Sequence, residues 1–75
     1  MDVHLKAWRE QRLLTQRELA EKAGVDQSTI VRVERSGKAP RFGTLRKLAK
    51  ALEVAPQLLR REPREDEQLA VALAS

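Results

Sequence analysis

The sequence has no cysteine, a single histidine, and aromatic residues at only 3% of its 75 positions. Without cysteine the chain can form neither a disulfide nor a thiolate-ligated zinc site, so packing alone must stabilise its fold. The one histidine, His4, has no cysteine or pair of carboxylates with which to form a catalytic constellation. The three glycines form no phosphate-cradling loop of a nucleotide-binding type. We therefore expect no enzyme activity, no cofactor and no metal site.

Long apolar runs are also missing. No segment is long and apolar enough to span a bilayer, and residues 1–14 alternate charge with hydrophobe where a signal peptide would carry an apolar block. We therefore expect a cytoplasmic protein with no membrane partner. A chain of 75 residues buries only about 60% of its unfolded surface on folding, so we expect one small domain built from local elements.

Charged residues, in contrast, are abundant and unevenly placed. Residues 1–61 hold 14 basic and 7 acidic side chains, a net charge of +7, whereas residues 62–75 hold 1 and 4, a net charge of −3. Seven of the cations and only one anion, Glu34, fall within residues 27–50. Such clustering suits a polyphosphate partner, although charge alone is equally consistent with a solvated surface rich in Arg and Lys.

Helix starts and stops are clearly marked, while strand alternation and hairpin signals are missing, so the pattern predicts an all-α fold. Thr15 is followed three residues later by Glu18, which predicts a capping box at a helix start. Gly24 suits the left-handed residue that ends this helix, and Asp26 suits the N-cap of the next one. Two helices joined by so short a turn form a helix-turn-helix.

Further helices are predicted around this pair. Their expected positions are 2–12, beginning at Asp2, then 42–52, a short fifth helix opened by Pro56 and carrying Leu58 and Leu59, and a last candidate at 63–74 opened by Pro63. We predict that residues 1–61 form one compact domain. Residues 62–75 are predicted to be an acidic C-terminal tail that is helical or, alternatively, disordered.

From Gln16 to Glu34 the sequence reads Gln-x-x-Leu-Ala-x-x-Ala-Gly-Val-x-x-x-x-Ile-x-x-Val-Glu. The small residues of this pattern have steric roles: Ala20 lets the two helices approach closely, and Gly24 makes the turn between them. Residues 14–37 resemble the helix-turn-helix of the lambda-repressor/Cro-like (XRE) family of DNA-binding proteins, and the resemblance extends from the first helix through Leu59. It implies a five-helix lambda-repressor-like domain that binds double-stranded DNA and regulates transcription.

The second helix of the motif, residues 27–35, is the one that the resemblance places in the major groove, and we call it the reading helix. If Ile30 and Val33 face inward, a rotation of about 100° per residue turns the opposite face of this helix outward. The outward residues are Ser28, Val31, Arg32 and Arg35, with Gln27 beside them at the N-terminus.

The resemblance and this geometry together assign candidate contacts. The candidate base contacts are Gln27, Ser28, Val31 and Arg32, and the candidate phosphate contacts are Gln16, Arg35, Lys38 and Arg41. For Ser28 and Val31, an exposed face that touches no base is an equal alternative. Each of the three phosphate-contact cations is equally consistent with a side chain that is only solvated. For Gln16 the alternative is a residue that is present only because it favours the helix.

Glu34 is an acid on the predicted DNA-facing helix, where it would repel phosphate unless it turned inward. The resemblance pairs such a residue with a basic one in the first helix, a position that Arg9 matches. We predict a structural ion pair between Arg9 and Glu34, with two independent surface charges as the alternative. Leu13 and Glu53 stand where the family often has glycine, so those turns are expected to be tight helical continuations or strained.

The start of the 42–52 helix also departs from the family pattern, because Arg41 and Gly43 replace its usual cap and first-turn residues. A single reading helix makes few base contacts, so repressors of this type usually bind palindromic operators as two-fold dimers. The candidate dimer contact is the apolar stripe of the tail, Leu69, Ala72 and Leu73. The alternatives are a dimer contact through the short fifth helix, and a tail that docks on its own domain or stays disordered. We expect a homodimeric repressor that associates with the nucleoid when bound to DNA.

The alternative interpretation is an antitoxin or coactivator-like module. Such a protein would use the same fold to bind a protein partner, either a toxin or the transcription machinery.

Overall fold

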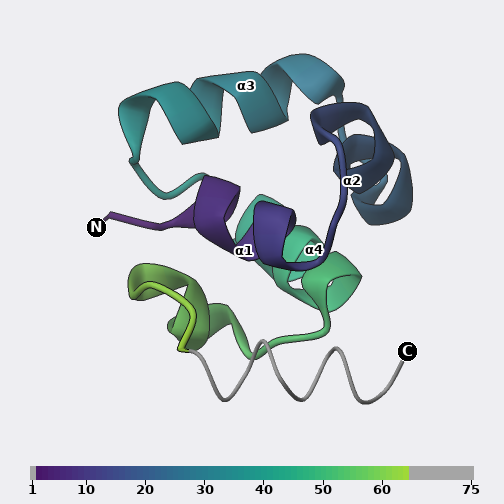
Figure 1. Ribbon diagram of the computed structural model, residues 1–75. Helices are drawn as coiled ribbons and strands as arrows, with labels where there is room; N and C mark the ends of the chain where they lie inside the picture. Colours follow the sequence, from purple (N-terminus) through teal and green to yellow (C-terminus); the bar gives the residue numbers. More distant parts are fainter. Residues whose placement is uncertain (1, 65–75) are drawn as a thin grey trace.

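The computed structural model describes residues 2–64, drawn in colour in Figure 1. These residues form four α-helices and one 3₁₀-helix, α1 (Leu5–Gln11), α2 (Gln16–Ala23), α3 (Gln27–Ser36), α4 (Phe42–Leu52) and η1 (Pro56–Arg60). Between residues 2 and 64 there is no β-strand, only an isolated antiparallel bridge between Asp2 and Lys38. The all-α fold class is confirmed, and the expected fifth helix takes the tighter 3₁₀ form.

The start of α2 follows from the local sequence. The backbone N–H of Glu18 donates to the Thr15 hydroxyl at 3.0 Å, and the N–H of Thr15 donates to the Glu18 carboxylate at 2.9 Å. The predicted capping box is therefore present. Gly24 ends the helix at φ +72°, a left-handed conformation that glycine adopts without steric cost.

The start of α3 is capped differently from the prediction. Asp26 occupies the N-cap position, but its side chain makes no capping hydrogen bond. The backbone carbonyl of Asp26 instead accepts the N–H of Thr29 at 3.0 Å. The helix then runs to Gly37, whose φ of +73° ends it in the same left-handed manner as α2.

The prediction that α1 begins at Asp2 is wrong, because residues 2–4 are not helical. The N–H of Val3 donates to the Gly37 carbonyl at 2.8 Å, and the N–H of His4 donates to the Leu59 carbonyl at 2.7 Å. These long-range bonds tie the segment to the turn after α3 and to η1. The helix consequently begins at Leu5, with His4 as its N-cap.

Two other helix ends contain a non-glycine residue in the left-handed region. Leu13, in the α1–α2 turn, and Glu53, after α4, both have φ of +59°. This conformation costs a residue with a Cβ about 1–2 kcal/mol. Of the two outcomes left open for these turns, a tight helical continuation or strain, the structure shows strain at both Leu13 and Glu53. The start of α4 was also open, and it lies at Phe42, with Arg41 as an N-cap that makes no side-chain bond.

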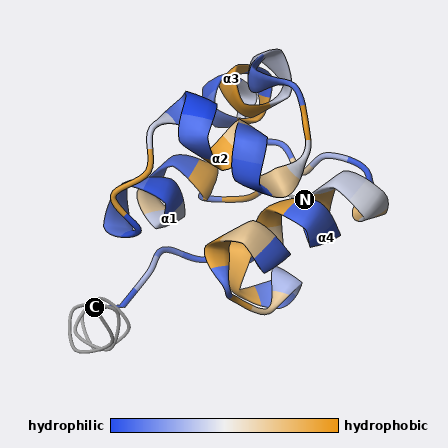
Figure 2. Ribbon diagram, turned by 90° about the vertical axis from the view of Figure 1, so that its right-hand side faces the viewer, coloured by the Kyte–Doolittle hydropathy of each residue, from blue (hydrophilic) through white to orange (hydrophobic). Residues whose placement is uncertain are grey.

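The core is entirely apolar and draws on every helix. Its buried members are Val3, Leu5, Trp8, Leu19, Ala20, Ile30, Val33, Leu45, Leu48, Ala49, Ala51, Leu52 and Leu59. Apolar residues recur along the helices between hydrophilic stretches in Figure 2, as expected for amphipathic helices around one core. In Figure 1, α3 runs along the upper edge of the molecule with α2 beside its N-terminal end, while α1 and α4 lie below.

The last predicted helix, 63–74, falls mostly outside the described residues. Residues 63 and 64 are not helical, and nothing further along the chain belongs to the described structure. The proposed dimer contacts Leu69, Ala72 and Leu73 also lie outside it. No helix in the described part of the chain is both long and apolar enough to cross a membrane.

Candidate nucleic-acid interface

α3 is anchored on one side and open on the other. Ile30 and Val33 are buried in the core, at 0% and 4% exposure. The exposed residues away from this buried face include Gln27, Ser28, Arg32 and Arg35. Val31, the remaining candidate base contact, is half-buried. The helix therefore offers a polar surface held at a fixed orientation by its buried face.

The N-terminus of α2 carries Gln16 as its first helical residue. The backbone N–H groups in the first turn of a helix have no helical acceptors, and together with the helix dipole they attract anions. Thr15 satisfies only one of them, that of Glu18. The half-buried side chain of Gln16 points toward α3, where its Nε2 donates to Glu34 Oε1 at 3.1 Å.

Arg9 and Glu34, the predicted ion pair, are brought together. Arg9 Nε donates to Glu34 Oε2 at 2.6 Å, and Arg9 Nη2 donates to Oε1 at 3.1 Å. The two side chains are only 11% and 6% exposed. Arg9 Nη1 also donates to the Leu14 carbonyl at 2.7 Å. The hydrogen bond to Glu34 raises the pKa of Arg9, partly offset by burial, so the Arg9 guanidinium stays protonated.

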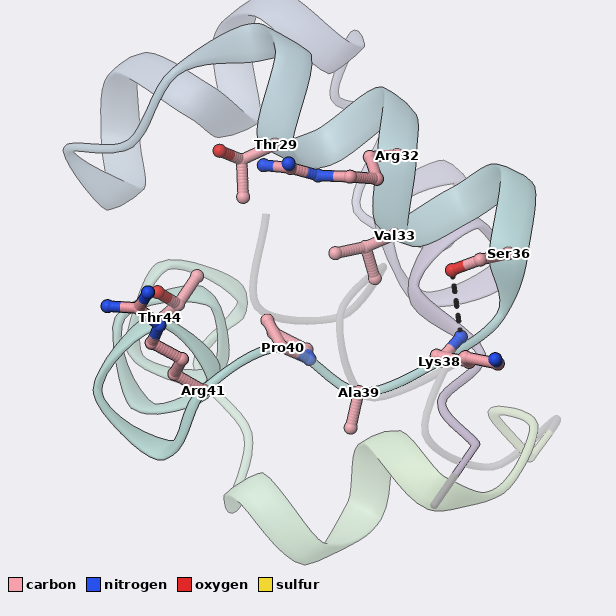
Figure 3. Close-up of a pocket in the computed structure, with 9 residues that line it drawn as sticks. All are labelled: Thr29, Arg32, Val33, Ser36, Lys38, Ala39, Pro40, Arg41 and Thr44. Carbon is pink, nitrogen blue, oxygen red and sulfur yellow. Dashed lines mark hydrogen bonds between the residues drawn. The ribbon is translucent and has the colours of Figure 1, made fainter.

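A groove of about 430 Å³ lies between α3 and the loop that leads into α4 (Figure 3). Its lining residues are Thr29, Arg32, Val33, Ser36, Lys38, Ala39, Pro40, Arg41 and Thr44. Three of them are cations, three carry hydroxyl groups, and none is acidic. Figure 3 shows Arg32 extending along α3 toward Thr29, with Arg41 and Thr44 on the opposite wall. The groove is a positively charged concavity beside the exposed face of α3.

The groove groups the candidate residues in a way that sequence reasoning missed. Arg32, a candidate base contact, shares it with the candidate phosphate contacts Lys38 and Arg41, whereas Arg35 is not among the lining residues. The position of Thr29 in the groove could have been predicted from the sequence, because Thr29 lies one helical turn before Arg32 and therefore on the same side of α3. The position of Thr44 could not have been predicted, since only the path of the loop brings α4 to this groove.

A protein-family model described as Helix-turn-helix matches residues 5–59. This match covers well over half of the chain, and the chain therefore belongs to that family, the XRE type to which lambda repressor and Cro are related. No match was found among curated proteins or among solved structures. The family is one of DNA-binding regulators and is not enzymatic. The family predicted from the Gln16 to Glu34 pattern is confirmed.

Proposed function

We propose that this protein is a sequence-specific transcriptional repressor that inserts α3 into the major groove of double-stranded DNA. The observation that carries the proposal is the two-sided character of α3, which is buried through Ile30 and Val33 and exposes Gln27, Ser28 and Arg32. The major groove admits one α-helix, and it displays a distinct donor and acceptor pattern for each base pair.

The proposed base contacts follow from the chemistry of the exposed side chains. Gln27 pairs with the N6 and N7 edge of an adenine, and Arg32 pairs with O6 and N7 of a guanine. Each such two-bond contact discriminates against a wrong base by about 1–3 kcal/mol. Ser28 adds a hydroxyl contact, and the half-buried Val31 meets a thymine methyl group.

The proposed phosphate contacts flank α3 on both sides. Gln16 and the N-terminal amides of α2 bind one phosphate. Lys38 and Arg41 each bind a further phosphate from the groove, where no acidic lining residue opposes them. Arg35, exposed near the end of α3, adds a third cation. These contacts set the register of α3 on the duplex, and the base contacts then select the sequence.

Two copies of the protein are proposed to bind one operator. The half-sites of a palindrome then lie about 34 Å apart, one turn of the duplex, and each receives one α3. The proposed dimer contact is the tail stripe of Leu69, Ala72 and Leu73.

The test is a measurement of DNA affinity by fluorescence anisotropy at several salt concentrations. The probes are a duplex recovered by selection from a random pool and a duplex of scrambled sequence. We expect tighter binding to the selected duplex and a logarithmic salt slope of about −3 per subunit, because each neutralised phosphate contributes about −0.9. Equal affinity for the two duplexes, or a flat salt dependence, contradicts the proposal.

A further inference from the structure

Glu34 accepts hydrogen bonds from two different helices at once. Arg9 of α1 occupies both of its carboxylate oxygens, and Gln16 of α2 donates to Oε1 at 3.1 Å. The Glu34 side chain is only 6% exposed. An acid in the helix that faces DNA is thus withdrawn from the surface, and its second hydrogen-bond partner, after Arg9, is the side chain at the anion-attracting end of α2.

This contact determines how the Gln16 amide is oriented. An ionised carboxylate only accepts hydrogen bonds, so the NH₂ end of the amide, and not its oxygen, must face Glu34. The NH₂ group carries two N–H donors, and a single bond to Glu34 leaves the second one available for a ligand. A long side chain that is already ordered also loses less rotamer freedom when it binds.

Arg9 makes this arrangement compatible with a negatively charged ligand. A carboxylate behind Gln16 would by itself repel a phosphate group. Its two hydrogen bonds to a guanidinium, at 2.6 and 3.1 Å, pair that negative charge and hold the carboxylate in place. The pair therefore supplies a hydrogen-bond acceptor for Gln16 without presenting a net negative charge.

We propose that Glu34 is a positioning residue for DNA binding, which holds the amide of Gln16 ready to donate to a backbone phosphate. The inference rests on the proposed function, because it assigns a role within the same DNA interface. It differs from a purely structural role for the ion pair, since it makes DNA affinity depend on Glu34 through Gln16 and through no other residue.

The first test is a double-mutant cycle with Glu34→Gln, Gln16→Ala and the double variant, using a mixed-sequence duplex as the probe. All affinities are measured at low temperature and corrected for the folded fraction seen by circular dichroism. We expect Glu34→Gln to weaken binding about fivefold to tenfold in the wild-type background, the range of one hydrogen bond, and to have almost no effect beside Gln16→Ala. Losses that multiply in the double variant overturn the proposal.

The matched control is Glu21→Gln, which removes the same negative charge from an exposed position on α2. Removing an acid strengthens attraction to DNA in general, so we expect this control to show no loss of affinity. A loss equal to that of Glu34→Gln contradicts the proposed role. If the wild-type protein binds no duplex at all, the proposed function fails, and this outcome is distinct from binding with multiplicative losses.

A second measurement uses only the wild-type protein and stands even if Glu34→Gln does not fold. Nitrogen-15 relaxation of the glutamine side-chain amides compares Gln16 with Gln27, which is exposed at the start of α3. We expect the Gln16 amide to be well ordered in the absence of DNA and the Gln27 amide to move freely on the nanosecond timescale. Equal mobility of the two amides overturns the proposal.

Discussion

Arg9 of α1 and Glu34 of α3 are joined by two hydrogen bonds of 2.6 and 3.1 Å, although 25 residues separate them in the sequence. Their side chains are almost entirely withdrawn from solvent, at 11% and 6% exposure. The pair fixes the first helix to the proposed reading helix. A second ion pair, between Arg17 and Glu21, is largely exposed to solvent, since its side chains are 79% and 66% exposed. The two pairs allow a direct comparison of burial.

Removing Glu34 should destabilise the fold strongly. We expect Glu34→Ala to lower the free energy of unfolding by about 3–5 kcal/mol, because it leaves the Arg9 guanidinium buried without its partner. The exposed counterpart Glu21→Ala should change it by less than about 1 kcal/mol. Urea unfolding followed by circular dichroism measures both, and an unchanged midpoint for Glu34→Ala contradicts a structural role for the pair.

The capping box of α2 should contribute stability that depends on pH. Hydrogen bonds from the backbone and side chain of Thr15 lower the pKa of Glu18 below its ordinary value of 4.5. A lowered pKa in the folded state means that the contribution is present above pH 4.5 and is lost as pH falls through the folded value. We therefore expect acid to destabilise Glu18→Ala less than it destabilises Glu21→Ala. The comparison is made by thermal melts at neutral pH and near pH 3, a pH below the ordinary pKa of a carboxyl group. An equal drop in melting temperature for the two variants refutes the prediction.

Replacing Leu13 by glycine should stabilise the protein. Leu13 is 88% exposed and has φ of +59°, so the substitution relieves strain without removing core packing. The relief of about 1–2 kcal/mol exceeds the extra unfolded-state entropy of glycine, about 0.5–1 kcal/mol, which leaves a gain of about 0.5–1 kcal/mol. The reciprocal change Gly24→Ala, at φ +72°, should lose about 1 kcal/mol. A decrease in the unfolding midpoint of Leu13→Gly contradicts the strain argument.

Arg32 and Lys38 line the same groove but are proposed to make different contacts. Arg32→Ala should lose about 1–3 kcal/mol of discrimination at a single base position of the selected duplex. Lys38→Ala should weaken binding to selected and scrambled duplexes alike and reduce the salt slope by about 1. Competition assays with single-base variants of the duplex separate the two. If Arg32→Ala weakens all sequences equally, Arg32 contacts phosphate and not a base.

The acidic tail is proposed to mediate dimerisation and to limit binding to random DNA, because residues 62–75 carry a net charge of −3. A protein truncated after Arg61 should sediment as a monomer at concentrations where the full chain is dimeric. It should also bind scrambled duplex more tightly than the full chain does. Identical sedimentation contradicts the dimer contact at Leu69, Ala72 and Leu73, and an unchanged affinity for scrambled duplex contradicts the electrostatic role.

Much of the helix-turn-helix could be predicted from the sequence because its determinants are local. The capping box of Thr15 and Glu18 involves residues three apart, and the left-handed turn at Gly24 depends on that residue's own conformational freedom. The buried face of α3 follows from helical periodicity. Such features require no knowledge of the rest of the chain. The family was predicted from the resemblance of the Gln16 to Glu34 pattern, and the match over residues 5–59 establishes it.

Only the tertiary structure decided the features that depend on residues far apart in the chain. The α1 helix begins at Leu5, and not at Asp2, because the N–H groups of Val3 and His4 bond to carbonyls more than 30 residues away. The amide of Gln16 faces Glu34 across two helices, and the groove forms where the loop before α4 passes α3. The sequence by itself determined α2, α3 and the exposure of Gln27, Ser28, Arg32 and Arg35 on α3, because capping and periodicity act within a few residues. The placement of Gln16, Arg32 and Thr44 depended on packing between elements, which no local pattern encodes.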